Sequence, residues 1–338
     1  MHEKSRKRKR PTSQDVADLA GVSRATVSAF LNKNRYVSPE LSERIETAIQ
    51  ELNYMPDPLA RALKLEDAQT IGLIIPVLSQ FYTPMIRAIN EIAQQNEYAL
   101  LLSSSEEEAD RERDLLETFV AKRASGILLG PCSEENRNLL ANIQRSGTPV
   151  VQVNRRIAGL ETDSVVSDNY RAAYGATEYL IQRGRRRIAY LGYDPTTLCN
   201  AEKKQGYDAA LRTHGLEDDL VITVKEHNGA QIANALNAFI DSAQPYDALI
   251  CTTQGKTAIA LRILLERGIQ VPGDVALVGF DDTPWSAMLC TPVTVVSEAT
   301  YRMGEEAIKL LLKRIRETEP QPAEHIVLET DFIIREST

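Results

Sequence analysis

The sequence predicts an α/β protein in which a small three-helix head precedes a core of two doubly wound lobes. Three observations predict this architecture. The first 64 residues contain three short helical patterns, and residues 70–338 alternate strand-length apolar runs with amphipathic helical runs. Charge divides the chain at the same place: residues 1–64 hold 12 Lys and Arg against 8 Asp and Glu, net +4, whereas the whole chain carries −8, which leaves −12 on residues 65–338. A basic head on an acidic body indicates that the head alone meets a polyanion.

The bulk composition is that of an ordinary globular protein, with 43% hydrophobic and 25% charged residues. No apolar run approaches the ~18–20 residues that span a bilayer. The basic start has no apolar segment behind it, so we expect no secretory signal and a cytoplasmic location. The cysteines are far apart and fit neither a metal site nor a disulfide framework, so we expect reduced, mostly buried thiols and no cofactor. They are Cys132, Cys199, Cys251 and Cys290.

The first helix of the head is expected to follow Thr12 or Ser13, which can cap it, and Asp15 completes a capping box with Thr12. Its apolar face comprises Val16, Leu19 and Ala20. Gly21 then ends the helix at a position that favours a left-handed residue. Residues 1–10 precede the helix as a flexible basic tail, for which a merely solvated role remains an alternative.

The second helix is expected after Ser23 as its N-cap, with Val27, Phe30 and Leu31 facing the core. The third begins at Ser38-Pro39 and continues with a clean amphipathic stripe. Three short helices with a glycine turn between the first two form the helix-turn-helix pattern. The second helix leaves mostly small residues outside the core, so its backbone can approach a major groove where Arg24 reaches guanine. A helical hairpin used only for packing is the alternative.

Residues 57–66 are expected to form a short linker helix after the head, which spans 11–56. Pro56 and Pro58 favour an extended entry, and Asp57 can cap the helix. The helix has about two turns, too few to be stable in isolation. Its apolar side, with Leu59 and Leu63, needs a partner, either a second copy of itself or a DNA minor groove.

The body, residues 70–338, contains nine strand-length apolar runs. They lie at 70–77, 98–104, 126–130, 149–154, 164–168, 187–193, 220–224, 248–251 and 275–280. Helical stretches such as Thr83–Gln95 and Glu107–Lys122 separate most of them. This alternation predicts parallel sheets with right-handed crossovers, and the strand number favours two lobes over one. Ligands in such folds bind at the carboxyl ends of the strands, so we expect a site in the cleft between the lobes.

The head resembles the DNA-binding head and hinge helix of the lactose-repressor (LacI) family of bacterial transcription regulators. The resemblance rests on the run "SQDVADLAGVSRATVSAFLNKNRYVSPELSERIETAIQELNYMPDPLARALK". It continues in the body through "VVSDNYRAAYGATEYLIQRGRRRIAYLG", "VPGDVALVGFDDTPWSAMLC" and "DFIIREST". The resemblance implies a body like that of periplasmic sugar-binding proteins. Its N-lobe would be 70–168 with 297–326, and its C-lobe 169–296 with 327–338.

The resemblance also implies a function. The chain would be a sequence-specific regulator, most simply a repressor, of a carbohydrate or related catabolic operon. It would bind palindromic operator DNA as a homodimer, with a sugar-like effector held between the lobes. The residues implied in DNA binding are Thr12, Ser23, Arg24, Ala25, Thr26, Ser28, Ala29, Asn32, Tyr54, Ala60, Arg61 and Leu63. Leu63 would wedge into the minor groove. Ala29 stands where the family usually has Arg, so this operator is expected to differ.

The effector residues implied by the resemblance are Phe81, Tyr82, Asn154, Arg155, Lys203, Gln254 and Asp281. Lys203 stands where the family usually has Arg, and an ammonium cannot bind two oxygens as a guanidinium does. Asn154 stands where the family often has Asp, and Thr253-Gln254 replaces a frequent Asn-Asp. The ligand therefore does not follow from the commoner members. For each of these residues a purely structural role remains an alternative.

Other functional classes fit the sequence less well. The run "QGKT" at 254–257 resembles the end of a phosphate-binding loop, but Ile250 stands where that motif needs Gly. The four His residues form no metal-binding pair, and no G-x-S-x-G nucleophile motif occurs. A sugar-binding protein or a sugar-converting enzyme without a regulatory role is the alternative function. The first would not need the head, and the second lacks a recognisable catalytic set, so we expect no enzyme.

Overall fold

The computed structural model describes residues 11–32, 35–54, 69–195, 197–216, 220–225, 228–242, 244–319 and 321–338. It divides into two compact units, Met1–Ala68 and Gln69–Thr338, which are described separately below. The expected tail 1–10 and linker helix 57–66 lie outside the described residues, and so do the roles predicted for Ala60, Arg61 and Leu63.

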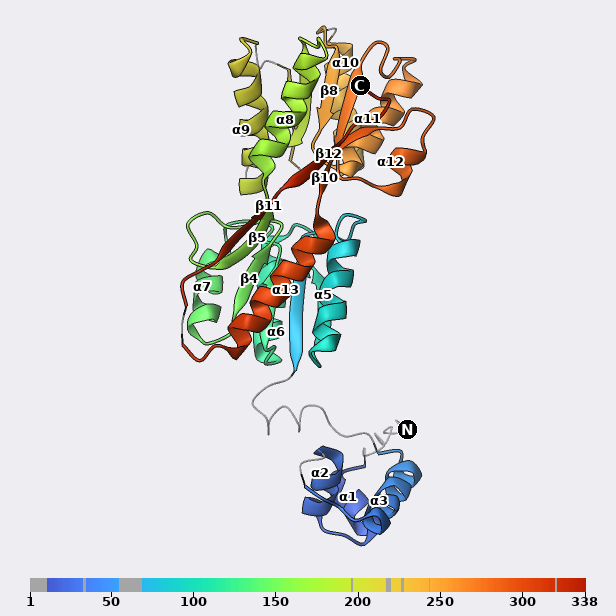
Figure 1. Cartoon of the computed structure of the whole chain (residues 1–338), viewed down its shortest axis with the longest axis vertical. Coiled ribbons are helices and arrows are strands. Elements are labelled where there is room, and N and C mark those ends of the chain that lie inside the picture. Colours follow the sequence, from blue (N-terminus) through green and yellow to red (C-terminus); the bar gives the residue numbers. More distant parts are fainter. Residues whose placement is uncertain are drawn as a thin grey trace, which may run out of the picture. The chain divides into compact units, whose positions relative to one another are not determined.

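The head consists of three helices, α1 (Ser13–Ala20), α2 (Arg24–Asn32) and α3 (Pro39–Leu52) (Figure 1). The predicted capping box is present at α1: the Thr12 hydroxyl accepts from the Asp15 amide at 3.3 Å, and the Asp15 carboxylate accepts from the Thr12 amide at 2.6 Å. Gly21 ends α1 with φ 64°, a left-handed conformation that glycine adopts without strain. Ser38 caps α3 as predicted.

The core of the head is made of small and β-branched side chains. Its buried members are Val16, Ala17, Ala20, Val27, Ile45 and Ala48. Phe30 and Leu31 pack against them, as predicted. Leu19 was expected on this face and is instead 50% exposed. The prediction was wrong because Ala17, not Leu19, shares the face of Val16 and Ala20, so the buried stripe of α1 is narrower than its apolar composition suggests.

The first sheet of the body is entirely parallel, in the order β11-β5-β4-β3-β1-β2. Its strands are β1 (Thr70–Ile75), β2 (Ala99–Ser104), β3 (Gly126–Leu129), β4 (Val150–Val153), β5 (Asp163–Ser167) and β11 (His325–Leu328). One face packs against α5 (Thr83–Gln95) and α13 (Thr300–Arg316), the other against α6 (Ala109–Ala121) and α7 (Arg137–Arg145). This lobe is the lower one in the body in Figure 1.

The second sheet has the order β12-β10-β9-β8-β6-β7, and β12 is antiparallel to β10. Its strands are β6 (Ile188–Tyr193), β7 (Val221–Val224), β8 (Ala248–Cys251), β9 (Ala276–Phe280), β10 (Thr294–Glu298) and β12 (Thr330–Ile333). One face packs against α8 (Asn169–Gln182) and α9 (Leu198–Thr213), the other against α10 (Gly229–Asp241) and α11 (Gln254–Glu266). The short α12 (Pro284–Met288) follows β9. All nine strand runs read from the sequence form strands.

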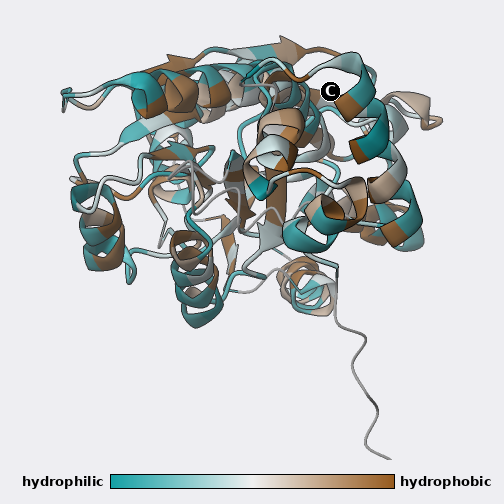
Figure 2. Cartoon of the chain, turned by 90° about the horizontal axis from the view of Figure 1, so that it is seen from below, coloured by the Kyte–Doolittle hydropathy of each residue, from teal (hydrophilic) through white to brown (hydrophobic). Residues whose placement is uncertain are grey.

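The apolar runs become central strands because both faces of each sheet are covered. In β1, Ile71 and Leu73 face α5 and α13, whereas Ile74 faces α6 and α7. Gly72 lies on the second face, and a Cβ there would meet the Phe119 ring at 2.2 Å, so only glycine admits this ring. The helices are banded in apolar and polar residues in Figure 2, as expected for helices that cover a sheet on one side.

The chain passes between the two lobes three times. The crossings follow Ser167 at the end of β5, Glu298 at the end of β10, and Leu328 at the end of β11. The lobe boundaries expected at 296/297 and 326/327 fall within β10 and β11, so these two crossings come about two residues later than predicted. Three adjacent segments form the hinge around which such lobes rotate.

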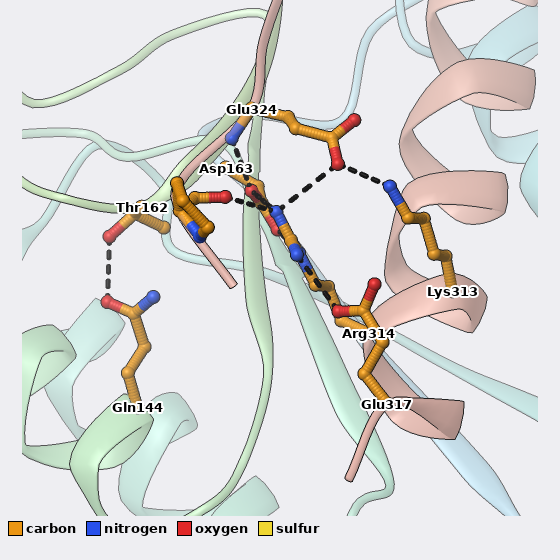
Figure 3. Close-up of polar contacts among 8 residues, drawn as sticks. Gln144, Thr162, Asp163, Lys313, Arg314, Glu317 and Glu324 are labelled. Carbon is orange, nitrogen blue, oxygen red and sulfur yellow. Dashed lines mark hydrogen bonds and ion pairs between the residues drawn. The ribbon is translucent and has the colours of Figure 1, made fainter. Parts of the chain in front are cut away.

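Arg314 holds the loop before β11 to the first sheet (Figure 3). Its guanidinium donates to both carboxylate oxygens of Asp163, at 2.7 and 2.8 Å, and to Glu317 and the carbonyl of Pro322. The Glu324 amide donates to the same Asp163 carboxylate at 2.7 Å. The loop between α13 and β11 is therefore tied to the start of β5 through one nearly buried ion pair.

Candidate functional site

The N-terminal part of α2 presents an exposed surface on the head. The side chains of Ser23, Arg24 and Ala25 are exposed, and those of Ser28 and Ala29 are half-buried. The Ser23 hydroxyl accepts from the Thr26 amide at 3.1 Å, the N-cap bond predicted from the sequence. Arg24 donates to the Ser13 hydroxyl at 3.1 Å, so its guanidinium is held at the start of both helices. A helix with small exposed residues and one arginine can enter a major groove.

The other residues predicted to contact DNA are placed differently. Thr12 is engaged in the cap of α1, and Tyr54 packs against the core of the head. Thr26 contacts the Ser23 hydroxyl at 2.8 Å. Asn32 is the last residue of α2. Contact of these residues with DNA stays a prediction.

A cavity of about 420 Å³ lies between the two lobes of the body. Its size is that of a small-molecule site. The cavity brings together all seven residues that the sequence predicted for the effector. They are Phe81, Tyr82, Asn154 and Arg155 of the N-lobe, and Lys203, Gln254 and Asp281 of the C-lobe. Whether they bind a ligand stays a prediction, but their assembly from two sheets around one space is a property of the fold.

The carboxyl ends of parallel strands supply most of the cavity wall. Asn154 directly follows β4, and Asp281 directly follows β9. Both have left-handed backbones, with φ 67° and φ 70°. Asn and Asp adopt this region more readily than other residues with side chains, but at some strain. The fold thus turns one amide and one carboxylate into the cavity from opposite lobes.

The N-lobe wall combines aromatic rings with an ion pair. The rings of Phe81 and Tyr82 meet edge to face, with centroids 5.0 Å apart. The Asn154 amide donates to the Tyr82 hydroxyl at 2.9 Å. Burial raises the pKa of Tyr82, so this phenol stays neutral. Arg155 donates two hydrogen bonds to Glu107, at 2.8 and 2.9 Å, in a bidentate pair that is largely shielded from solvent.

The C-lobe wall contains a second ion pair at the hinge. Lys203 on α9 donates to Glu298 at 3.2 Å and lies 4.6 Å from the ring centroid of Phe280. The Ser167 hydroxyl donates to the other oxygen of Glu298 at 2.8 Å. Burial lowers the pKa of Lys203, but the nearby Glu298 and Asp281 carboxylates more than offset this and raise it overall. Glu298 therefore joins two crossing strands to a helix of the C-lobe.

Asp281 is the carboxylate of the cavity wall that forms no ion pair among the described residues, although the charge of Lys203 acts on it. It accepts one hydrogen bond, from the Gln254 amide at the start of α11, at 3.1 Å. Burial, and then the charge of Glu298, raise the pKa of Asp281 to about 6. The carboxylate is ionised at neutral pH and can accept hydrogen bonds from hydroxyl groups of a ligand.

Sequence reasoning missed four residues of this site. Tyr193 and Trp285 add aromatic surface to the cavity, Glu298 lines it at the hinge, and Glu107 pairs with Arg155. Two of these had a readable signal: Tyr193 ends an apolar strand run, and Trp285 follows the "GFDD" loop that also supplies Asp281. The pairing of Glu107 with Arg155 depends on the relative position of two loops, so no signal in the sequence could have revealed it.

Within the described ranges, no group of three or more His, Cys, Asp or Glu residues could hold a metal ion. None of the described helices is long and apolar enough to cross a membrane. The cysteines are unpaired. Cys132 and Cys251 are buried as expected, and burial raises the pKa of both thiols to about 12, but Cys290 is exposed.

Known proteins match both the head and the body of the chain. Residues 12–57 match the model of bacterial regulatory proteins of the lacI family, and residues 68–336 match the periplasmic binding proteins and sugar binding domain of the LacI family. The ribose operon repressor of Escherichia coli (strain K12) is 32% identical over 309 residues, which cover 90% of this chain and 93% of that protein.

Solved structures of the same kind of regulator also resemble this chain. A complex of the transcriptional regulator CelR with cellobiose is 30% identical with a TM-score of 0.72, covering 97% of this chain and 100% of that chain. The Lac repressor dimer bound to operator and the anti-inducer ONPF is 20% identical with a TM-score of 0.84, covering 97% of this chain and 99% of that chain, and shows likeness of fold. With a helix-turn-helix head and a two-lobed body both matched, this chain is a member of the LacI family of bacterial transcriptional regulators.

Proposed function

We propose that this protein represses a carbohydrate or related catabolic operon and that a sugar-like effector in the interlobe cavity controls its binding to DNA. It acts in the cytoplasm as a homodimer that places two heads on a palindromic operator, with half-sites about one helical turn apart. We expect no chemical reaction in the cavity. Its residues bind and position a ligand.

The observation that carries the proposal is the position of the cavity between the lobes, beside two of the three crossing segments. Its walls come from both lobes, and Glu298 lies in the wall and at the end of a crossing strand. A ligand that contacts both walls favours one arrangement of the lobes over another. A binding event can shift a conformational equilibrium only by this difference in affinity.

A sugar is supported by the chemistry of the lining. Aromatic rings such as Phe81 and Trp285 offer flat apolar surfaces for a sugar ring, while Asn154 and Asp281 offer hydrogen-bonding groups for its hydroxyls. Two of the similar proteins are a ribose operon repressor and a regulator in complex with cellobiose. These names support the sugar class without specifying the sugar.

Two measurements on the full chain test the proposal. The first selects duplexes from a random pool and measures their affinity over a salt series. Sequence-selective binding that weakens steeply with salt is expected. The second is a thermal-shift screen with sugars, sugar acids and nucleosides. Removal of residues 1–64 should abolish duplex binding and preserve the thermal shift. Duplex binding that survives this deletion would contradict the proposal, as would a nucleoside shifting the transition where no sugar does.

A further inference from the structure

The cations of the interlobe cavity already have partners. Two cationic side chains, those of Arg155 and Lys203, line the cavity. Arg155 is bound by both oxygens of Glu107, and Lys203 is bound by Glu298. The side chains of Lys203 and Glu298 are only 10% and 3% exposed. Each cation is already neutralised by a carboxylate, so an incoming anion gains less from it than from an unpaired cation.

A third lysine lies behind the cavity wall and is not part of it. Lys256 is fully buried on α11, and its amine has no hydrogen-bond partner within the described residues. It lies against the ring of Tyr193, which lines the cavity, and not in the wall itself. Burial lowers the pKa of Lys256 well below its ordinary value. The amine behind Tyr193 therefore holds its proton less tightly than either lining cation, and Tyr193 separates it from a ligand in the cavity.

The balance of charges leaves the cavity negative. Arg155 and Lys203 stand against Glu107, Glu298 and Asp281, two positive against three negative charges. Asp281 is the unbalanced group, and its one hydrogen bond comes from a backbone amide. It can accept hydroxyl donors, but it repels another carboxylate or a phosphate.

We propose that the cavity selects an uncharged, polyhydroxylated ligand and rejects sugar acids and sugar phosphates, with Glu298 as the residue that sets this selectivity. The inference rests on the sugar-effector function proposed above and narrows its ligand class. Glu298 is the determinant because it lines the cavity, neutralises Lys203 and is fixed in place by Ser167. An acid that captured Lys203 would leave Glu298 buried without its cation.

The test uses the full chain and matched sets of ligands: glucose, glucuronate and glucose phosphate; galactose, galacturonate and galactose phosphate; ribose and ribose phosphate; and cellobiose. Calorimetric titration gives each affinity for the unmodified protein, for Glu298→Gln, and for the double variant Lys203→Gln/Glu298→Gln. Glu106→Gln is the matched control, because Glu106 is exposed and close to Glu107 in sequence. Thermal unfolding of each variant checks that it folds.

In the unmodified protein, the neutral member of the set that binds should be at least about tenfold tighter than its acid and phosphate. Glu298→Gln removes one negative charge and frees Lys203, so it should narrow that preference by about tenfold. The double variant should show the same preference for the neutral sugar as the unmodified protein, because no freed ammonium remains to bind the acid or the phosphate. Glu106→Gln should leave the preference unchanged.

The possible failures are distinct. If an acid or a phosphate binds the unmodified protein as tightly as its neutral parent, the selectivity is wrong, while the sugar-effector function stands. The selectivity is equally wrong if Glu298→Gln leaves the preference unchanged in a folded protein. If no member of any set binds either the unmodified protein or the variants, the sugar-effector function fails and this inference falls with it.

Discussion

Asp281 occupies an unfavourable position for a carboxylate in the ligand-free protein. Its backbone is left-handed, and burial together with Glu298 raises its pKa to about 6. Strained backbones and raised carboxylate pKa values concentrate at binding sites, where the fold holds them in place. We therefore expect Asp281 to lower the stability of the ligand-free body, while its carboxylate is placed to accept hydrogen bonds from a ligand.

The variant Asp281→Asn should be more stable than the unmodified protein above pH 6, by roughly 1–3 kcal/mol. Between the ordinary pKa of 3.8 and about 6, the folded protein holds a proton on Asp281 that the unfolded chain has lost, so the stability of the unmodified protein falls as pH rises through this window. Asn carries no such charge. Urea unfolding of the body at a series of pH values measures the difference.

The same variant should bind the effector more weakly, because an amide replaces one acceptor by a donor. The stability difference should vanish below about pH 4, where both states of the unmodified protein are protonated. A difference that is independent of pH would show that the charge of Asp281 is not its cause.

Arg24 is the arginine on the exposed surface of α2, and we expect it to read a base. Arg24→Ala should weaken binding to the selected duplex by roughly 1–3 kcal/mol and relax the preference at one base pair. Arg35→Ala provides a control, because Arg35 is exposed but lies outside α2. Competition between single-base variants of the duplex measures the preference. An unchanged profile for Arg24→Ala would exclude base readout by this residue.

At the scale of elements, α8 and α9 pack closely because of one glycine. A Cβ at Gly206 on α9 would lie 2.2 Å from the carbonyl oxygen of Tyr170 on α8. Gly206→Ala should therefore force the helices apart and destabilise the body by roughly 1–3 kcal/mol. Gly175→Ala is the matched control on α8, where a Cβ meets nothing within 4 Å. Alanine there should stabilise the helix by roughly 0.5–1 kcal/mol, and equal effects at both positions would contradict the packing argument.

The ion pair that ties the loop before β11 to the start of β5 gives a second prediction at this scale. Arg314→Met leaves Asp163 buried without its cation and should destabilise the body by about 3–5 kcal/mol. Lys313→Met is the neighbouring control, since Lys313 pairs with Glu324 in a more exposed position and should contribute less than about 1 kcal/mol. Chemical denaturation measures both. A loss for Arg314→Met no larger than for Lys313→Met would show that this ion pair does not stabilise the fold.

The elements that follow from local pattern were predictable from the sequence. The strand runs of β1 to β9 and the whole of α5 were read directly, because covered parallel strands are continuous apolar runs. Leu19 shows the limit: its spacing from Val16 and Ala20 placed it on the core face, but α1 buries Ala17 there and leaves Leu19 50% exposed. The exact crossing points also escaped prediction, because the hydrophobic pattern of β10 and β11 does not reveal which sheet each strand joins.

At the scale of the whole molecule, the family resemblance located the cavity residues but not their pairing. All seven predicted positions line one cavity. Which carboxylate neutralises which cation depends on loops from distant parts of the chain, as in the pairs Arg155–Glu107 and Lys203–Glu298. These pairs decide the charge that a ligand meets. The selectivity of the site is therefore a tertiary property, whereas its location is a property of the fold.

We expect the body to couple a ligand to DNA because Glu298 belongs both to the cavity wall and to the end of a crossing strand. Ser167 and Glu298 end two of the crossing strands and are joined by a hydrogen bond beside Lys203. A ligand that changes this contact changes the relative stability of lobe arrangements. Couplings of this kind are typically about 1–3 kcal/mol, or roughly 5–150-fold in affinity.

The most direct test of ligand control is the affinity of the full chain for its selected duplex, measured with and without a saturating concentration of the sugar that binds the cavity. The sugar should change the duplex affinity at least about fivefold in the unmodified protein, and Asp281→Asn should need a higher sugar concentration for the same change. Equal duplex affinity with and without the sugar in the unmodified protein would contradict ligand control, because the cavity would then bind a ligand that does not act on the head.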